Sequence, residues 1–247
     1  MRSAQTPSDG ETQKSPAEGT GAPTIQDLRR DFGRDRLIEE TAGRDPFALF
    51  RRWFDDALGA QLRDANAFVL ATADVSGRPS SRVLLLKDYS PAGFVFYTNY
   101  ASRKARNLAT NPHAAILFYW AEHERQVRIE GRVEKVSREE SAEYFALRPR
   151  ASQLGAHASH QSRVIHDRSE LENRFAALEK EYRADAAIPL PEDWGGYLLA
   201  PEAIEFWQGR SNRLHDRLLF SKGAAGAADP NEAGSPAPGW ERTRLSP

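Results

Sequence analysis

Residues 68–99 decide the fold and read FVLATADVSGRPSSRVLLLKDYSPAGFVFYTN. They contain three short runs that are rich in β-branched and aromatic residues, at 68–73, 82–87 and 94–98. Ser76-Gly77 and Pro91-Ala92-Gly93 separate these runs, and such Pro- and Gly-containing clusters are typical of turns between strands. Because strands joined this closely run antiparallel, the stretch predicts an antiparallel sheet.

The same pattern continues on both sides of this stretch. Further strands are expected at 114–120, 126–136, 204–208, 217–221 and 240–245. Helices are expected to begin at Asp45-Pro46 and at Ser102, and capping boxes at Ser137-x-x-Glu140 and Ser169-x-x-Glu172 predict two more, over 138–148 and 170–184. The predicted fold class is mainly β (α+β), a small antiparallel barrel with peripheral helices.

Several of the expected strands are apolar at consecutive positions rather than at alternate ones. These runs are 83–86, 94–97 and 116–120. A strand of this kind is covered on both faces. The cover is either helices of the same chain or a second subunit, and the sequence leaves both open.

The composition excludes several classes of protein. The 247 residues are 40% hydrophobic and 28% charged with a mean hydropathy of −0.65, and no run approaches the roughly 18 apolar residues of a membrane-spanning helix. The net charge of −1 provides no overall field that would attract nucleic acid. Because the chain has no cysteine, thiolate nucleophiles and iron–sulfur clusters are excluded, and redox chemistry would need an organic cofactor.

Two segments have low complexity. Residues 1–24 have almost no large apolar side chains, which predicts a disordered tail, and residues 223–239 are expected to form a flexible surface loop. The remainder, 25–247, is expected to be one domain that contains this loop. The tail carries acidic residues and lacks the apolar core of a secretion signal, so a cytoplasmic location is expected.

Positive charge is concentrated locally in two segments. Residues 82–106 carry Arg82, Lys87, Arg103, Lys104 and Arg106 against the single acid Asp88, and residues 144–163 carry Arg148, Arg150 and Arg163 with no acid. A phosphomonoester carries about −1.5 to −2 charges near neutral pH, so these cations match two phosphorylated ligands. The alternative is that they only solvate the surface.

The spacing within the first segment favours ligand binding. Free amides at the helix start near Ser102, together with Arg103 and Lys104, can form a phosphate cradle, although Ser102 can also be an ordinary N-cap. Arg82 and Lys87 lie five positions apart on an expected strand and therefore point to opposite faces. We expect them to bind two different groups.

A third cluster lies near the C-terminus. Arg213, His215 and Arg217 alternate along the chain and would share one face if the segment is extended. Placing these groups together on one face costs free energy unless the face meets an anion or an electron-rich ring. Trp207 and Gln208 could add an aromatic wall and an amide, and both a structural and a functional role remain open for His215 and for Trp207.

Metal and dinucleotide sites are not expected. His157-x-x-His160 has no carboxylate within a turn, so no metal site is predicted. The sequence contains no GxGxxG or GxxxxGK[ST] motif.

The order and spacing of these motifs resemble those of pyridoxamine 5′-phosphate oxidases. The resemblance covers about residues 45–221 and the closing segment 240–247. The blocks that carry it are Arg82-Val-Leu-Leu-Leu-Lys87, Phe94-Val-Phe-Tyr97-Thr98-Asn, Ser102-Arg103-Lys104, Glu124-Arg-Gln126-Val, Tyr144-Phe-x-x-Arg148-Pro-Arg-x-Ser152-Gln, Gln161-Ser162, Glu205-Phe-Trp207-Gln-Gly and Arg213-Leu-His215-Asp-Arg217. The inserted segment 223–239 and the loose fit of 31–41 depart from the family pattern.

The resemblance implies a fold and an activity. The fold is an FMN-binding split barrel, with the flavin at the interface of a homodimer. The implied reaction converts pyridoxamine or pyridoxine 5′-phosphate to pyridoxal 5′-phosphate, with a hydride passing from substrate C4′ to flavin N5 and O₂ reduced to H₂O₂. No nucleic-acid or membrane partner is implied.

The resemblance also implies site residues. It assigns the flavin to Arg82, Val83, Leu84, Leu85, Leu86, Lys87, Tyr97, Thr98, Arg103, Lys104, Gln126, Gln161, Ser162, Trp207 and Arg217. It assigns the substrate phosphate to Lys87, Tyr144, Arg148 and Ser152, and it sets Arg213 and His215 over the pyridine ring as the catalytic residues.

Two other functions stay open at this point. A split-barrel flavin reductase, or an oxidase of another phosphorylated compound, would keep the flavin residues but would not need Lys87, Tyr144, Arg148, Ser152, Arg213 and His215 together. A small barrel that only carries pyridoxal phosphate, or binds nucleic acid, would need no flavin.

Overall fold

The computed structural model describes residues 24–28, 30–183, 186–223 and 239–247. The chain divides into two units, Met1–Asp31 and Phe32–Pro247, and the described part of the first contains the short 3-10 helix η1 (Ile25–Asp27). Apart from Thr24, Gly223 and Gly239, the predicted tail 1–24 and the predicted loop 223–239 lie outside the described residues, so both stay predictions.

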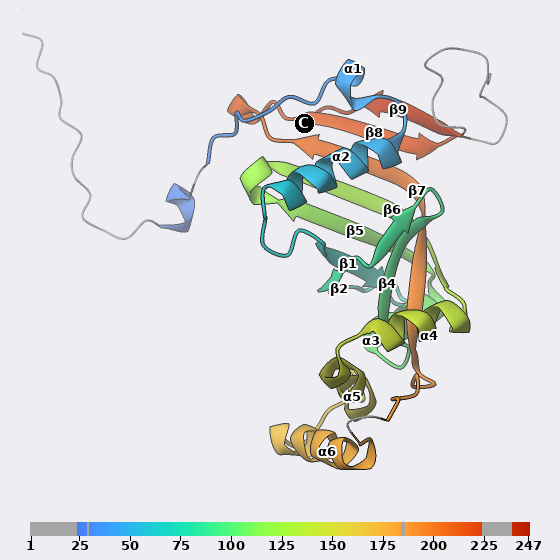
Figure 1. The fold of residues 1–247 in the computed structure, drawn as a ribbon. Helices are drawn as coiled ribbons and strands as arrows, with labels where there is room; N and C mark the ends of the chain where they lie inside the picture. The colour runs from blue at the N-terminus through green and yellow to red at the C-terminus, as the bar shows by residue number, and fades with distance from the viewer. Residues whose placement is uncertain (1–23, 29, 184–185, 224–238) are drawn as a thin grey trace, which may run out of the picture. The chain divides into compact units, whose positions relative to one another are not determined.

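The second unit combines strands and helices (Figure 1). The helices are α1 (Glu39–Ala42), α2 (Pro46–Gly59), α3 (Arg103–Thr110), α4 (Arg138–Leu147), α5 (Arg150–Ala158) and α6 (Arg168–Glu181), with short 3-10 helices η2 (Ala121–His123) and η3 (Ser211–Arg213). The strands are β1 (Ala67–Ala73), β2 (Pro79–Leu85), β3 (Asp88–Ser90), β4 (Gly93–Asn99), β5 (His113–Trp120), β6 (Arg125–Lys135), β7 (Trp194–Gln208), β8 (Asp216–Lys222) and β9 (Trp240–Arg244).

Strand β7 is where the sheet divides. The strand order is β2-β1-β5-β6-β7-β4-β3, and every pairing is antiparallel. On one edge β7 pairs with β6 along most of its length, while on the other edge its first part pairs with β4 and its last part with β8. Two leaves therefore diverge from one strand, as in a split barrel.

A bulge lies in the long β6–β7 pairing. The register shifts between Glu130 and Gly131, and a Cβ atom built on Gly131 would lie 2.1 Å from the carbonyl oxygen of Ala200. Only glycine allows this close approach of two backbones. A bulge bends the strand that carries it. The bend at this position lets the paired strands β6 and β7 belong to both leaves.

Helix α2 buries its apolar face against the sheet. Phe47, Leu49, Phe50 and Trp53 are buried on this face. The ring of Phe50 lies 5.0 Å from that of Phe94 and 5.3 Å from that of Phe118, measured between centroids. Helix and both leaves thus share one hydrophobic core.

Most of the predicted helix starts are confirmed. The side chains of Asp45, Ser102 and Ser137 each accept a hydrogen bond from a backbone amide of the first turn of α2, α3 and α4. The capping box at Ser169 is wrong. Asp167, two residues upstream, caps α6 by accepting from the amide of Glu170, and the Glu170 carboxylate accepts in turn from the amide of His166.

The predicted elements differ from the observed ones in two strand features and one helix. The turn at Ser76-Gly77 joins β1 to β2 as expected, but the turn at 91–93 joins β4 to the short strand β3, and β2 pairs with β1 alone. Strand β7 begins at Trp194, ten residues before the expected 204–208. Helix α5 was not predicted, because Pro149 and Gly155 weaken the helical signal of this segment.

The expectation that three apolar runs are covered on both faces holds only for β4 within the single chain. Nearly every residue of β4 is buried, whereas Val83 of β2 is 65% exposed and Tyr119 of β5 is 57% exposed. No helix of the described residues covers these side chains. A second subunit therefore remains the candidate cover for β2 and β5.

We predict that Phe50→Ala destabilises the protein by about 3–5 kcal/mol, because it opens a cavity in the core that both leaves share. Leu58→Ala in the same helix is the matched control, since Leu58 is 51% exposed and its truncation should cost less than about 1 kcal/mol. Denaturant unfolding measures both values. Equal losses in the two variants would contradict this view of the core.

Candidate functional site

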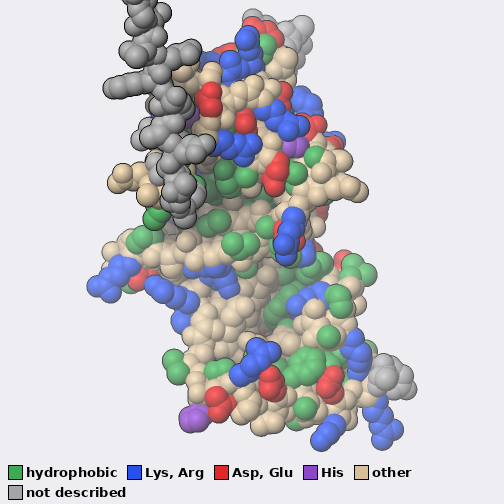
Figure 2. Space-filling model, turned by 90° about the vertical axis from the view of Figure 1, so that its left-hand side faces the viewer, with side chains coloured by type: hydrophobic (Ala, Val, Ile, Leu, Met, Phe, Trp, Pro, Cys, Tyr) green, Lys and Arg blue, Asp and Glu red, His purple; other side chains and the backbone are tan. Residues whose placement is uncertain are grey.

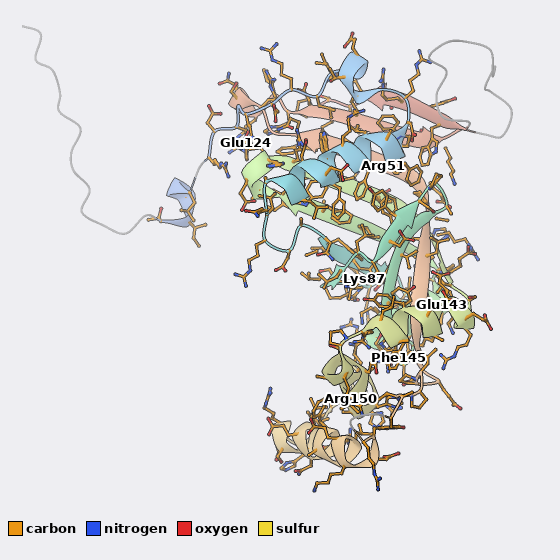
Figure 3. All side chains as sticks on the ribbon, in the orientation of Figure 1. Arg51, Lys87, Glu124, Glu143, Phe145 and Arg150 are labelled. Carbon is orange, nitrogen blue, oxygen red and sulfur yellow. The ribbon has the colours of Figure 1, made fainter. Side chains whose placement is uncertain are left out.

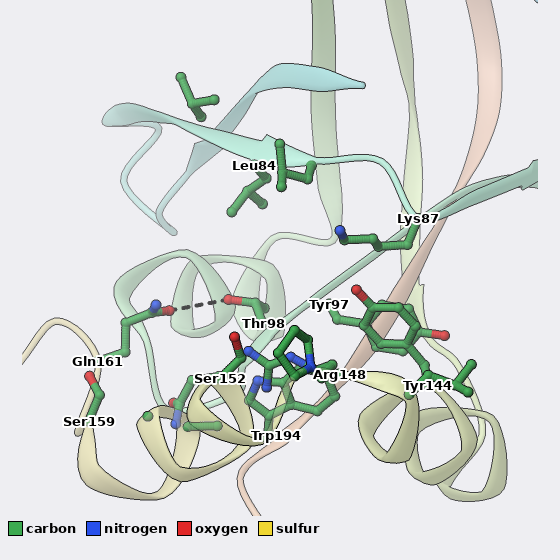
Figure 4. Close-up of a pocket in the computed structure, with 17 residues that line it drawn as sticks. Leu84, Lys87, Tyr97, Thr98, Tyr144, Arg148, Ser152, Ser159, Gln161 and Trp194 are labelled. Atoms are coloured by element: carbon green, nitrogen blue, oxygen red, sulfur yellow. Dashed lines mark hydrogen bonds between the residues drawn. The ribbon is translucent and has the colours of Figure 1, made fainter. Parts of the chain in front are cut away.

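A cleft of about 680 Å³ opens where β2 and β4 face α4 and α5 (Figure 4). Of the predicted site residues it is lined by Val83, Leu84, Leu85, Lys87, Tyr97, Thr98, Tyr144, Arg148, Ser152 and Gln161. The structure thus brings together both cationic segments of the sequence. We call this cleft the phosphate cleft, because of the anion-binding groups described next.

Parallel aromatic rings form one wall of the phosphate cleft. The rings of Tyr97 and Tyr144 stack at 4.0 Å between centroids, and the ring of Trp194 lies parallel to that of Tyr97 at 5.5 Å. Gly196 is directly opposite Tyr97 in the β4–β7 pairing, and a Cβ atom there would lie 2.7 Å from the Tyr97 ring. The missing side chain of this glycine lets the ring lie flat against β7.

Arg148 lies at the corner between α4 and α5 and stacks on this wall. Its guanidinium carbon is 4.7 Å from the centroid of the Trp194 ring, and burial lowers its pKa from the ordinary arginine value. Its Nη1 atom is buried without a hydrogen-bond partner, and none of the ion pairs among the described residues involves it. A buried donor without a partner is costly, so this atom indicates a site for an anion.

Lys87 and Ser152 face the same space. Lys87 follows the end of β2, and its Nζ lies 5.9 Å from the centroid of the Tyr144 ring. Ser152 is in the first turn of α5 and lines the cleft. With Arg148 and the Tyr144 hydroxyl they present hydrogen-bond donors of the kind that a phosphate needs.

A second group of donors surrounds the buried side chain of Lys104 in α3. Its Nζ donates to the Gln161 side chain at 2.7 Å, to Thr98 Oγ1 at 3.0 Å and to Ser102 Oγ at 3.3 Å. Burial, with a smaller contribution from the charge of Arg82, lowers the pKa of Lys104 to about 8. An anion at this position would raise this pKa again by stabilising the charged amine.

Arg82 is held beside Lys104 by neutral partners. It donates to the Leu70 carbonyl at 3.0 Å, to Thr72 Oγ1 at 2.9 Å and to Ser80 Oγ at 2.7 Å. Burial, and then the charge of Arg103, lowers its pKa. Arg82, Arg103 and Lys104 do not line the cleft themselves but lie behind Thr98 and Gln161, which do. No carboxylate of the described residues forms an ion pair with Arg82 or Lys104, so this group beside the cleft carries net positive charge.

The start of α3 completes this second group. The amide of Arg103 donates to Ser162 Oγ at 3.2 Å, which holds the segment after α5 against the helix start. Arg103 itself is exposed. Two cations, hydroxyl groups and a helix N-terminus are the donor set of a phosphate site, so the residues present fit the phosphate of a bound cofactor. Leu86, in contrast, points into the core.

The remaining predicted cofactor residues line a separate, smaller cleft. Gln126, Trp207 and Arg217 surround about 280 Å³ together with Leu117, Arg128, Glu205 and Pro247. The buried Glu205 carboxylate accepts from Arg217 at 2.8 Å and from Arg128 at 2.6 Å. The hydrogen bond from Arg217 to Glu205 raises the pKa of the guanidinium, so Arg217 stays charged.

The predicted common face of Arg213, His215 and Arg217 is wrong. Strand β8 begins only at Asp216, and Arg213 ends the turn η3 with a φ of 62°. Alternation of side chains therefore does not extend back to Arg213. His215 instead packs its ring against Trp207 at 4.6 Å, and its Nδ1 accepts from the backbone amide of Arg210 at 3.1 Å.

The two clefts lie toward opposite ends of β7. Trp194, its first residue, lines the phosphate cleft, and Trp207, near its end, lines the smaller one. Thirteen steps at about 3.3 Å each separate the two residues by up to about 40 Å of strand. The labelled residues Lys87 and Phe145 accordingly lie toward one end of the sheet and Glu124 toward the other (Figure 3).

Sequence reasoning missed several residues that line the phosphate cleft. They are Asn99, Leu147, Pro149, Gly155, Ala156, Ser159 and Trp194. For Trp194 a signal was present. Its neighbours Gly195 and Gly196 indicate close approach by other groups, and a large aromatic residue next to such a position is a candidate wall.

Comparison with known proteins identifies the family. Residues 54–181 match the family described as pyridoxamine 5′-phosphate oxidase, and residues 194–247 match the pyridoxine 5′-phosphate oxidase C-terminal dimerisation region. A pyridoxine/pyridoxamine 5′-phosphate oxidase from Burkholderia orbicola (strain MC0-3) is 52% identical over 224 residues, which cover 91% of this chain and 99% of that protein. The chain belongs to the pyridoxine/pyridoxamine 5′-phosphate oxidase family. A pyridoxine/pyridoxamine 5′-phosphate oxidase from Rubrobacter xylanophilus is also 52% identical, and the match covers 89% of this chain and 95% of that protein.

Solved structures confirm the predicted fold class. PhzG from Burkholderia lata 383, in complex with tetrahydrophenazine-1-carboxylic acid, has a TM-score of 0.75 at 33% identity and covers 86% of this chain and 98% of its own. A pyridoxamine 5′-phosphate oxidase-related, FMN binding protein from Nostoc punctiforme PCC 73102 has a TM-score of 0.60 at 20% identity, over 80% of this chain and 97% of its own, which is a likeness of fold. Membership of the family implies a flavin cofactor.

The described residues offer neither a metal site nor a membrane-spanning helix. These contain no cluster of His, Asp and Glu that could hold a metal ion, and none of their helices is long and apolar enough to span a bilayer. His157 donates through Nε2 to the carbonyl oxygen of Pro189 at 2.7 Å. Over the face seen in Figure 2, acidic and basic side chains are interspersed.

We predict that Lys104 makes the stability of the flavin-free protein depend on pH. Its pKa is about 8 in the fold and near 10.5 in the unfolded chain, so between these values the unfolded chain binds more protons and stability rises with pH. Relative to Lys104→Met, the free energy of unfolding of the unmodified chain should rise by on the order of 2 kcal/mol from pH 7 to pH 10.

Denaturant unfolding at several pH values checks this difference. Lys180→Met, which removes an exposed amine from α6, is the control and should leave the pH profile unchanged. A constant difference between the unmodified chain and Lys104→Met across the range would refute the assignment.

Proposed function

We propose that this chain oxidises pyridoxine 5′-phosphate and pyridoxamine 5′-phosphate to pyridoxal 5′-phosphate, with FMN as cofactor and O₂ as the final oxidant. The observation that carries the proposal is a pair of donor groups at the phosphate cleft. One surrounds Arg148, which lines the cleft, and the other surrounds Lys104, which lies beside it and donates to the lining residues Thr98 and Gln161. Among the described residues no ion pair joins a carboxylate to either cation. Two phosphate sites at one cleft suit a phosphorylated cofactor beside a phosphorylated substrate.

The group around Lys104 is assigned to the FMN phosphate. Arg82 and Lys104 supply buried charge, and Arg103 lies at the start of α3 beside Ser162. Thr98 and Gln161, which now bind the Lys104 amine, would turn toward the ligand or continue to orient that amine. The β2 backbone from Val83 to Lys87 passes along the same cleft and is assigned to the flavin ring.

The group around Arg148 is assigned to the substrate phosphate. Lys87, Tyr144, Arg148 and Ser152 are the residues. The orphaned Nη1 of Arg148 would gain its missing partner, and burial of the site strengthens each charged hydrogen bond. The phosphate would thereby fix the substrate at one end and leave its ring free to face the flavin.

The site is proposed to be completed by a second copy of the chain. Arg213, His215, Gln126, Trp207 and Arg217 lie toward the far end of β7 from the phosphate cleft, so one chain cannot offer both sets to one ligand. In a twofold dimer each chain would contribute both sets, one to each site. The exposed apolar side chains of β2 and β5, and the match of 194–247 to a dimerisation region, support this arrangement.

The chain's own residues would bind and orient the cofactor and the substrate and would donate hydrogen bonds to them. When bound, FMN supplies the two-electron acceptor that O₂ then regenerates with formation of H₂O₂. Because Nδ1 of His215 accepts from the Arg210 amide, its neutral ring carries the proton on Nε2 and would donate to the substrate's alcohol or amine. Burial, and then the charge of Arg213, lowers the pKa of His215, which favours this neutral form.

The oxidation of each substrate balances in electrons and protons. The alcohol of pyridoxine 5′-phosphate loses two electrons and two protons to give the aldehyde. The amine of pyridoxamine 5′-phosphate first becomes an imine, and water then releases ammonia. In both cases the protein needs no nucleophile of its own, which agrees with a chain that has no cysteine.

The first test of the proposal is a spectrum and an oxidase assay. Protein reconstituted with FMN should be yellow and should convert pyridoxine 5′-phosphate in air to an aldehyde with an equal amount of H₂O₂. Arg213→Ala should reduce turnover by about 100-fold or more and retain flavin, because Arg213 is assigned to the substrate alone. Protein that takes up no FMN would exclude both this oxidase and the flavin alternatives.

The second test addresses the shared site. Arg148→Ala and Arg213→Ala homodimers should each have low activity, but after subunits are exchanged in equal amounts the mixed dimers should contain one intact site. Half of the dimers are then mixed, so activity should recover to about a quarter of the unmodified value. No recovery, despite exchange verified by mass spectrometry of differently tagged chains, would show that both residues act within one chain.

A further inference from the structure

We propose that Trp194 is a positioning residue for the substrate phosphate, because its ring holds the Arg148 guanidinium in the orientation that leaves donors free. The inference rests on the proposed assignment of Arg148 to that phosphate. None of the sequence motifs includes Trp194, and the geometry around it points to this role.

The ring takes a place that a carboxylate usually takes. An arginine in a buried position is commonly fixed by an acidic partner, which occupies its donors and cancels its charge. Arg148 has no such partner among the described ion pairs and lies 4.7 Å above the Trp194 ring and 5.6 Å from the Phe145 ring. A ring face orients the guanidinium and leaves its N–H groups free for an anion.

The backbone of Arg148 is fixed separately from its side chain. Buried Gln153 donates through Nε2 to the carbonyl oxygens of Phe145, Ala146 and Arg148, which ties down the corner between α4 and α5. What remains free at this corner is the rotation of the long Arg148 side chain. The contact with Trp194 is the interaction that limits it.

Trp194 is itself held rigidly. It is 6% exposed, its ring is nearly parallel to those of Tyr97 and Tyr144, and Phe145 packs edge-on at 5.1 Å. Its carbonyl accepts from Arg138 at 2.9 Å. A ring held this firmly can fix the orientation of the Arg148 guanidinium that lies on it.

The test separates this role from simple packing through a specificity ratio. Trp194→Leu keeps an apolar side chain but removes the ring face. We expect KM for pyridoxine 5′-phosphate to rise about tenfold with kcat within twofold, and the dissociation constant of FMN to stay unchanged. The ratio of kcat/KM for pyridoxine 5′-phosphate to that for unphosphorylated pyridoxine should fall by the same factor. Trp194→Phe, which keeps a smaller ring, should show about a threefold effect and serves if the leucine variant does not fold.

Leu154→Ala is the matched control for packing. Leu154 is buried in the same small apolar cluster as Trp194 but lies outside the phosphate cleft. It should lower the melting temperature without changing the specificity ratio. If Trp194→Phe and Trp194→Leu change stability and flavin affinity in the manner of Leu154→Ala and leave the ratio unchanged, the positioning role is overturned.

A double-mutant cycle with Arg148→Ala then identifies the route of the effect. If Trp194 acts through Arg148, Trp194→Leu should have no further effect on KM once Arg148 is alanine. Equal effects in both backgrounds would overturn the inference while leaving the proposed oxidase intact. An Arg148→Ala variant with unchanged KM would instead overturn the phosphate assignment on which the inference rests.

Discussion

The pairing of β7 with β6 along most of its length is the constraint on which the arrangement of the site depends. It extends the strand far enough that its first part can pair with β4 and its last part with β8, so two leaves share one strand. The phosphate cleft forms at one end and the Arg217 cleft at the other. A site that needs both sets of residues therefore needs two copies of the chain, and the exposed apolar residues of β2 and β5 offer a surface for that association.

The two clefts treat their cations in different ways. In the smaller cleft the buried carboxylate of Glu205 forms ion pairs with both Arg128 and Arg217, and Glu130 forms a second one with Arg128. At the phosphate cleft and beside it, Arg148, Arg82 and Lys104 are held by hydroxyls, carbonyls and rings, and burial lowers the pKa of each. Uncompensated charge costs folding free energy in the free protein. That cost is what an anionic ligand removes, so stability is exchanged for binding at this end of the molecule.

Local signals in the sequence were reliable where one short-range interaction decides the structure. The caps at Asp45, Ser102 and Ser137 were predicted from the residue and its position, because the side chain bonds to an amide within the same turn. Ser169 failed because a competing cap lies two residues upstream. Arg213 failed because two consecutive residues with positive φ end the extended geometry that the alternation argument assumed. The competing pattern Asp167-x-x-Glu170 can be read in the sequence, whereas the positive φ values of Asn212 and Arg213 cannot be read from residue type.

The sequence by itself determined the fold class, the concentration of cations in two segments and the family resemblance, since each of these depends on residue type and spacing along the chain. Only the tertiary structure decided which cations share a cleft, which side chain is a wall rather than core, and that Gln126, Trp207 and Arg217 lie apart from Lys87 and Arg148. The physical reason is that these relations depend on long-range strand pairing. Trp194 and Arg148 are brought into contact because the start of β7 packs against α4, and no local preference of either residue specifies that packing.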